Sequence, residues 1–234
     1  MIDVRPFESL GSFRNDWLDA HYHFSFSGYH DARRQNWGLL RVWNDDTIQP
    51  HTGFGRHGHR DMEIITYVRE GAISHRDHLG NDGRTVAGDV QVMSAGRGIE
   101  HEEHNLEDGL TQIFQIWIFP NENGVKPGWE TRAFPKGEQS GTLVTLASGR
   151  TKDSGALPIH QDAAILAASL APGQTVRREV EPGRFLYLVP AAGVMTVNGQ
   201  RVKARDGVAI TGEDALEITA SEPSEVLIAD VPAL

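Results

Sequence analysis

The stretch GFGRHGHRDMEIITYVREG, residues 53–71, decides the fold. Two histidines near its start, His57 and His59, are separated by one glycine, and a β-branched and aromatic run, Ile64–Val68, follows and leads to Gly71. Residues i and i+2 of a β-strand point to the same side of the sheet. On a strand, both imidazoles can therefore point at one place inside a β-barrel.

Short apolar runs of the same kind continue along the chain. They are rich in β-branched and aromatic residues, which favour strands, and the 25 glycines mark turns between them. Examples are Val90–Met93, Ile113–Phe119, Phe185–Val189, Val194–Val197 and Val226–Ala229. Only Ala163–Ser169 suggests a helix. The sequence predicts an all-β fold of the sandwich or barrel kind.

A weak internal repeat predicts two such barrels. Glu63–Gly71 (EIITYVREG) matches Phe185–Gly193 (FLYLVPAAG), and each is followed by a strand, a turn and another strand. Residues 121–141 are rich in glycine, proline and charge and are interpreted as a crossover linker. We expect an N-terminal barrel over residues 1–137 and a C-terminal barrel over residues 138–234.

Composition excludes several classes of function. The 234 residues include no cysteine, which rules out disulfides, Cys-ligated zinc, iron–sulfur clusters and thiol nucleophiles. The net charge of -10 disfavours direct binding to nucleic acid, which depends on Lys and Arg. The chain has no apolar run of 18 residues and does not begin like a signal peptide. We expect a cytoplasmic protein that does not bind a membrane.

The histidines gather in the first half of the chain. Ten of the 11 lie between His21 and His104, and His160 is the only later one. His101 and Glu103 have the same i, i+2 relation as the first histidine pair. If the two strands are neighbours, three imidazoles and one carboxylate converge. Such a set suits one divalent ion, namely Fe(II), Mn(II), Co(II), Ni(II), Cu(II) or Zn(II), and leaves open positions on a six-coordinate ion.

The carboxylate that completes this set has more than one candidate. Glu63 lies four residues after His59, has the same strand parity, and is therefore also a candidate to face inward. Glu102 faces away from His101, so strand parity favours Glu103 over Glu102. Glu63 remains an alternative ligand.

The other histidines are expected to have no role at the metal. His21 and His23 precede phenylalanines without an acidic partner nearby, which favours a structural role. His75 and His78 flank a turn-like segment and are expected to be exposed. His104 is expected on the opposite strand face from His101, or at a turn.

Residues 53–71 and 88–105 (GDVQVMSAGRGIEHEEHN) resemble the two cupin motifs as pirin-family proteins carry them. Four further segments also look pirin-like: Trp17–Ala20, His23–Phe26, Leu40–Asp46 and Gln115–Pro120. The resemblance implies a bicupin, with two jelly-roll-like β-barrels packed together. It places the metal ligands of the first barrel at His57, His59, His101 and Glu103. Aligning Gly193 on Gly71 places Glu179, Glu181 and Phe185 at His57, His59 and Glu63, so the second barrel lacks the ligands.

The resemblance also implies an activity, because similar bacterial members are quercetin 2,3-dioxygenases. A divalent metal, Fe(II) in first place, would lower the pKa of a flavonol hydroxyl, and Glu103 or Glu63 would accept its proton. Dioxygen would then open the ring and carbon monoxide would leave. Phe54, Met62 and Met93 are candidates for apolar pocket walls. The alternative is a metal-binding, redox-sensing or regulatory protein that acts through a protein partner, as the iron-dependent transcriptional cofactor of animals does.

Overall fold

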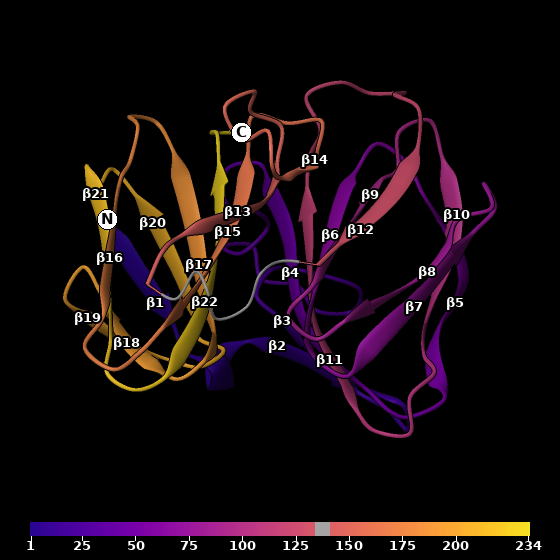
Figure 1. The fold of residues 1–234 in the computed structure, drawn as a ribbon, viewed down its shortest axis with the longest axis horizontal. Helices are drawn as coiled ribbons and strands as arrows, with labels where there is room; N and C mark the ends of the chain where they lie inside the picture. The colour runs from indigo at the N-terminus through magenta and orange to yellow at the C-terminus, as the bar shows by residue number, and fades with distance from the viewer. Residues whose placement is uncertain (134–140) are drawn as a thin grey trace.

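The computed structural model describes residues 1–133 and 141–234, and these residues form almost only β-strands. Two barrels lie side by side, one built mainly by the first half of the chain and one by the second (Figure 1). A single short 3-10 helix, η1 (Phe7–Ser9), occurs in the described residues. Among the described residues, no helix has the length and apolar character needed to cross a membrane. The prediction of an all-β, two-barrel fold is confirmed.

The first barrel consists of a seven-stranded and a four-stranded sheet. The larger sheet contains, in spatial order, β12 (Gly128–Arg132), β9 (Val90–Ser94), β6 (Glu63–Glu70), β11 (Thr111–Ile118), β4 (Leu40–Ile48), β3 (Leu18–Tyr22) and β2 (Gly11–Arg14). The smaller sheet contains β5 (Thr52–His59), β10 (Ile99–Asn105), β7 (Ala72–Asp77) and β8 (Asp82–Val86).

The second barrel has the same two-sheet construction. Its larger sheet contains β1 (Ile2–Arg5), β20 (Gly207–Thr211), β17 (Phe185–Ala192), β22 (Ser224–Val231), β15 (Ala164–Leu170), β13 (Val144–Ser148) and β14 (Leu157–Pro158). Its smaller sheet contains β16 (Thr175–Glu179), β21 (Ala215–Ala220), β18 (Val194–Val197) and β19 (Gln200–Lys203).

The predicted internal repeat is present in the strand pairing. β6 pairs with β9 and β11, and β17 pairs in the same way with β20 and β22. Gly71 and Gly193 begin the matching hairpins with φ of 71° and 83°. A Cβ atom would lie 2.6 Å from the carbonyl oxygen of Leu110 in the first case and of Pro223 in the second. Both turns therefore require glycine.

Two features differ from the sequence predictions, and one further prediction falls on residues that are not described. Residues 163–169 are not helical, because β15 pairs with β13 on one side and β22 on the other, and this pairing overrides the helix propensity of alanine. The expected linker contains β12, which pairs with β9. The expected boundary between residues 137 and 138 lies outside the described residues.

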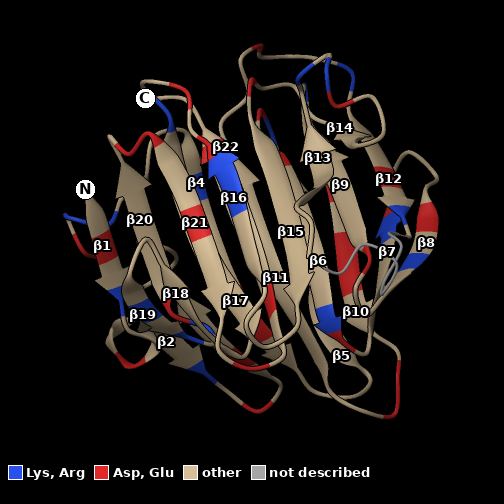
Figure 2. Cartoon of the chain, turned by 60° about the vertical axis from the view of Figure 1, so that its left-hand side comes forward, with Lys and Arg blue, Asp and Glu red and all other residues tan. Residues whose placement is uncertain are grey.

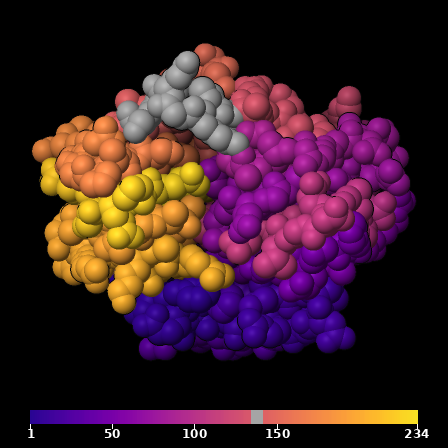
Figure 3. Space-filling model, turned by 60° about the horizontal axis from the view of Figure 1, so that its bottom comes forward, coloured from indigo at the N-terminus to yellow at the C-terminus, as the bar shows by residue number. Residues whose placement is uncertain are grey.

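The N-terminal strand crosses to the other barrel. β1 pairs with β20 and so belongs to the sheet of the second half. The space-filling view shows the N-terminal residues along the lower side of both halves (Figure 3). Long-range pairing of this kind has no local sequence signal.

The core lies in three places. The two large sheets pack face to face through side chains of both halves, including Trp43, Phe114 and Tyr187. One continuous apolar cluster fills the second barrel, and its strands β15, β17 and β20 carry no charged residues (Figure 2). The first barrel instead has two separate clusters, one around Ile113 and one around Ile99. The region between those clusters contains the candidate site.

Candidate functional site

A layer of polar side chains lies between the two apolar clusters of the first barrel. Its five members are buried and come from five strands: Asn44, Thr66, Gln91, Glu103 and Gln115. The register aligns four of them, because Gln115 pairs with both Asn44 and Thr66, and Thr66 pairs with Gln91. We call these five residues the polar layer.

The second barrel has apolar residues at the same register positions. Ile228 pairs with Leu166 and Leu188, and Leu188 pairs with Val208. Ile218 takes the place of Glu103, and all five belong to one apolar cluster. The same architecture therefore closes without a polar layer, so the fold does not require the polar residues of the first barrel.

Three histidines converge next to this layer. His57 and His59 on β5 and His101 on β10 each place a ring nitrogen within 4.8 Å of the others. β5 pairs with β10, which is the condition on which the predicted convergence depends, and His101 lies opposite His57. Glu103 lies opposite Phe54, so β5 contains one extra residue between these pairs. Such a bulge changes the direction of the side chains next to it.

The histidine cluster has the electrostatic character of a metal site. Burial and the neighbouring imidazoles lower the pKa of His59 to about 4 and that of His101 to about 2. Neutral imidazole, with a free lone pair, is the form that binds a metal. The buried Nε2 atom of His101 also has no hydrogen-bond partner. The three side chains fit a divalent ion.

Glu103 is the buried carboxylate beside this cluster. Its Oε1 atom accepts a hydrogen bond from Gln91, and its Oε2 atom accepts one from Gln115 at 3.0 Å. Burial raises the pKa of Glu103 to about 7, although both amides oppose the rise. A second group of donor atoms within 4.8 Å contains Glu103, His101 and His75. His101 therefore belongs to both groups.

The prediction that His75 is exposed is wrong. β7 lies between β8 and β10, and His75 on its inward face is 1% exposed. Its Nε2 atom is 3.0 Å from Oδ2 of Asp77, and its Nδ1 atom is 3.4 Å from Nδ1 of His101. The ring stacks on Trp129 at 4.7 Å between centroids. The i, i+2 spacing of His75 and Asp77 could have placed both side chains on one face of a strand. The turn-like segment that follows them led instead to the prediction that His75 is exposed.

Glu63 lies outside the cluster of His57, His59 and His101. The chain leaves β5 after His59 and begins β6 at Glu63, so the two residues do not share one strand. Glu63 accepts a hydrogen bond from Ser94 at 2.7 Å, and its other oxygen is 3.4 Å from Nδ1 of His160. Neither group of donor atoms within 4.8 Å contains Glu63.

Three further histidines lie as the sequence predicts. His23 is fully buried between the barrels, with Nδ1 2.9 Å from the hydroxyl oxygen of Tyr187, which agrees with the structural role expected for it. His78 is exposed. His104 lies on the face of β10 opposite His101 and is 3.9 Å from Glu102.

A cavity of about 410 Å³ opens onto the cluster. His57, His59 and Glu103 line it together with five aromatic residues: Trp17, Tyr22, Phe26, Phe54 and Trp117. Asn44, Asp46 and Gln115 add polar groups. Phe54 is a wall residue, as predicted, whereas Met62 and Met93 pack in the apolar cluster around Ile99. An apolar cavity with a few polar groups is typical of a small-molecule site.

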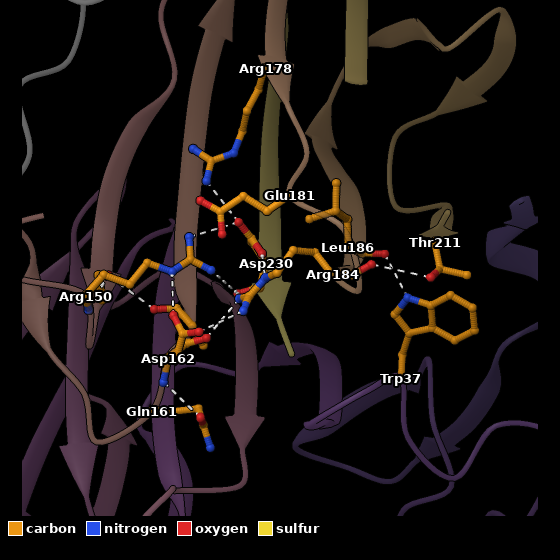
Figure 4. Close-up of polar contacts among 12 residues, drawn as sticks. Trp37, Arg150, Gln161, Asp162, Arg178, Glu181, Arg184, Leu186, Thr211 and Asp230 are labelled. Atoms are coloured by element: carbon orange, nitrogen blue, oxygen red, sulfur yellow. Dashed lines mark hydrogen bonds and ion pairs between the residues drawn. The ribbon is translucent and has the colours of Figure 1, made fainter. Parts of the chain in front are cut away.

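The second barrel has an ion-pair cluster at the corresponding end. Leu216 takes the register position of His101 and pairs with Arg178, so Arg178, rather than Glu179, corresponds to His57. The connection to β17 is one residue longer than its counterpart, which accounts for the shift. Arg150, Arg178 and Arg184 all donate to Asp230 (Figure 4). No group of three potential metal donors occurs among the described residues of this half.

Known proteins match the whole chain. The family model Pirin matches residues 3–118, and the family model Quercetinase C-terminal cupin domain matches residues 145–231. A pirin-like protein of Caulobacter vibrioides is 57% identical over 98% of this chain and 99% of its own. A quercetin 2,3-dioxygenase of Escherichia coli K12 is 39% identical over 99% of both chains. The crystal structure of the bacterial pirin YhhW from Escherichia coli in complex with nickel(II) has a TM-score of 0.94 at 37% identity, over 100% of both chains.

Proposed function

Because the chain belongs to the pirin family, we propose that it is a metal-dependent dioxygenase that opens the ring of flavonols such as quercetin. The observation that carries the proposal is the cluster of His57, His59 and His101 beside the buried carboxylate of Glu103, at an aromatic cavity that His57, His59 and Glu103 line. The relatives named quercetin 2,3-dioxygenase support the same reaction. Such a reaction needs one flavonol and one dioxygen, and yields a ring-opened ester and carbon monoxide without an external reductant.

His57, His59 and His101 are the proposed nitrogen ligands, and Glu103 is the proposed oxygen ligand. The unpartnered Nε2 atom of His101 supports its assignment. Fe(II) is the ion proposed first, and the nickel(II) complex of the Escherichia coli pirin supports a divalent ion of the same series. When bound, the ion would lower the pKa of the flavonol 3-hydroxyl and make the substrate reactive towards dioxygen.

The protein side chains provide the remaining functions. Glu103 is held by two amides beside the histidines and accepts the proton of the 3-hydroxyl. The aromatic walls exclude water and hold a planar ring system through stacked and edge contacts, as Trp117 already contacts His59 at 5.0 Å between centroids. Gln91 and Gln115 are positioning residues, since they fix the orientation of Glu103.

The test is turnover of quercetin by protein of known metal content, in air and under argon. We expect the flavonol absorbance to fall only in air, with carbon monoxide released, and we expect His57→Ala to abolish both. Equal loss under argon, or undiminished loss in His57→Ala, would contradict the proposal. That result would favour the alternative, a regulatory protein whose metal state controls binding to a protein partner.

A further inference from the structure

Four buried side-chain oxygens on described strands of the first barrel have no hydrogen-bond partner: Oδ1 of Asn44, Oδ1 of Asp46, Oε1 of Glu63 and Oγ1 of Thr66. Oε1 of Glu63 lies 3.4 Å from Nδ1 of His160, whereas no ion pair is found for the other three. Buried polar atoms in native proteins are nearly always paired, so each exception needs an explanation. Asn44 and Asp46 line the cavity, whereas Thr66 does not.

The second barrel shows that the fold needs neither of the two cavity residues. Asn44 pairs with Gln115, and Leu166 occupies the same position opposite Ile228. Asp46 pairs with Ile113, and the corresponding strand places Ala168 opposite Val226. Leu166 and Ala168 both belong to the apolar cluster of that barrel. A role in binding, rather than in folding, accounts for the polar pair.

The pair lies across the cavity from the histidines. Asn44 and Asp46 are on β4 of the larger sheet, and His57 and His59 are on β5 of the smaller sheet. All four line the same cavity, together with Phe54 and other aromatic residues. A molecule that reaches both walls therefore has one end at the histidines and another at the polar pair.

We propose that Asn44 and Asp46 bind a hydroxyl group of an aromatic substrate whose other end lies at the histidine cluster. We call this pair the hydroxyl anchor. The inference rests on the proposed function for the histidine end and adds the substrate class, a phenol with a hydroxyl remote from the metal-binding group. Asn44 and Asp46 thereby become specificity-determining residues.

The chemistry of the two side chains matches a hydroxyl, which both donates and accepts a hydrogen bond. An amide offers a donor and an acceptor. Burial, together with the charges of Asp45 and Glu103, raises the pKa of Asp46 well above its usual value. The neutral acid also offers both a donor and an acceptor. A hydroxyl group can satisfy both unpartnered atoms, whichever of the two side chains donates.

The test compares two flavonols that differ only away from the metal-binding group. Quercetin carries hydroxyls on both outer rings, whereas 3-hydroxyflavone carries only the 3-hydroxyl. Binding is measured without oxygen on nickel(II)-loaded protein, by quenching of tryptophan fluorescence, since Trp17 and Trp117 line the cavity. The variants Asn44→Leu and Asp46→Ala copy the second barrel, and Thr66→Val removes the unpartnered oxygen outside the cavity.

Asn44→Leu and Asp46→Ala should each weaken quercetin binding about threefold to tenfold and leave 3-hydroxyflavone binding unchanged. Thr66→Val should change neither affinity, and nickel content should stay equal in all variants. If Asn44→Leu fails to fold, the affinities of Asp46→Ala for the two flavonols test the proposal by themselves.

Unchanged quercetin affinity in the folded variants would overturn the hydroxyl anchor, as would equal loss for both flavonols. Neither result would contradict the proposed dioxygenase activity. Wild-type protein that binds neither flavonol would overturn the proposed function and this inference together.

Discussion

Asp77→Asn should disable the metal site without a change at any proposed ligand. His75 lies between Asp77 and His101 and contacts both. These two contacts determine which ring nitrogen of each histidine carries the proton. Hydrogen bonds from Asn81, His75 and Leu79 outweigh burial and lower the pKa of Asp77, so it is a carboxylate that accepts from Nε2 of His75. Nδ1 of His75 then accepts from Nδ1 of His101, which leaves Nε2 of His101 free for an ion.

The substitution reverses the direction of the hydrogen bonds that link residue 77, His75 and His101. Oδ1 of Asp77 accepts backbone hydrogen bonds from Leu79 at 2.9 Å and from Asn81 at 3.1 Å. Oδ2 accepts from Nδ2 of Asn81 at 2.8 Å as well as from His75. An asparagine that keeps its oxygen on the two backbone donors turns its amino group towards His75, and the side-chain amide of Asn81 then turns its oxygen to that amino group. Nε2 of His75 must then accept, Nδ1 donates to His101, and the proton of His101 moves to Nε2, the ligand atom. Loss of such a partner typically weakens metal binding about 10-fold to 100-fold.

The assay is competition of nickel(II) or Fe(II) between the protein and a chelator, with Asp82→Asn as the matched control. Asp82 is an exposed residue of β8 that pairs with Arg76, and its charge also acts on His75. Asp82→Asn therefore removes the same charge near His75 but leaves the hydrogen bond between His75 and Asp77 in place. We expect reduced affinity in Asp77→Asn and wild-type affinity in Asp82→Asn, with ¹⁵N spectra reporting the histidine tautomers. Equal affinities in both variants, or an unchanged tautomer of His101, would refute the reasoning.

Three further predictions follow from the site and from the contact between the barrels. His57→Ala or His101→Ala should remove most bound metal, measured by elemental analysis, while the fold survives, because the two-barrel core does not depend on one ion; global unfolding would instead mark the site as structural. Glu103→Gln should lower metal content and turnover together, whereas Glu63→Gln should leave metal content largely intact; the reverse ranking would make Glu63 the ligand. Burial lowers the pKa of His23 well below its ordinary value of 6.5, so the unfolded chain takes up a proton there first as pH falls. In metal-free protein, His59 and His101 act in the same direction, because their pKa values are also lowered. His23 itself should contribute up to about 1.4 kcal/mol per pH unit to the decrease in the free energy of unfolding below pH 6.5, measured by denaturant unfolding. His23→Gln should reduce the slope by that contribution; an unchanged slope would contradict the assignment.

The sequence predicted the histidine cluster because its signal is local. His57 and His59 have strand spacing, as do His101 and Glu103, and the repeat of Gly71 at Gly193 located the second barrel. These inferences need only the period of a strand and the backbone demands of a turn.

The parts that were missed depend on contacts between distant segments. The polar layer joins residues of five strands, and only the register shows that Asn44, Thr66 and Gln115 meet. The burial of His75 depends on β7 lying between two other strands and on Trp129 covering the ring. The expected helix at residues 163–169 was wrong for the same reason, because sheet pairing outweighs local propensity.

The fate of labelled dioxygen tests the central claim most directly. Metal-loaded protein is given quercetin under ¹⁸O₂, and the ring-opened product and the gas phase are analysed by mass spectrometry. A dioxygenase at the first barrel places both ¹⁸O atoms in the organic product and releases unlabelled carbon monoxide, and His57→Ala forms neither. A product without both labels, or hydrogen peroxide formed in place of carbon monoxide, would contradict the account.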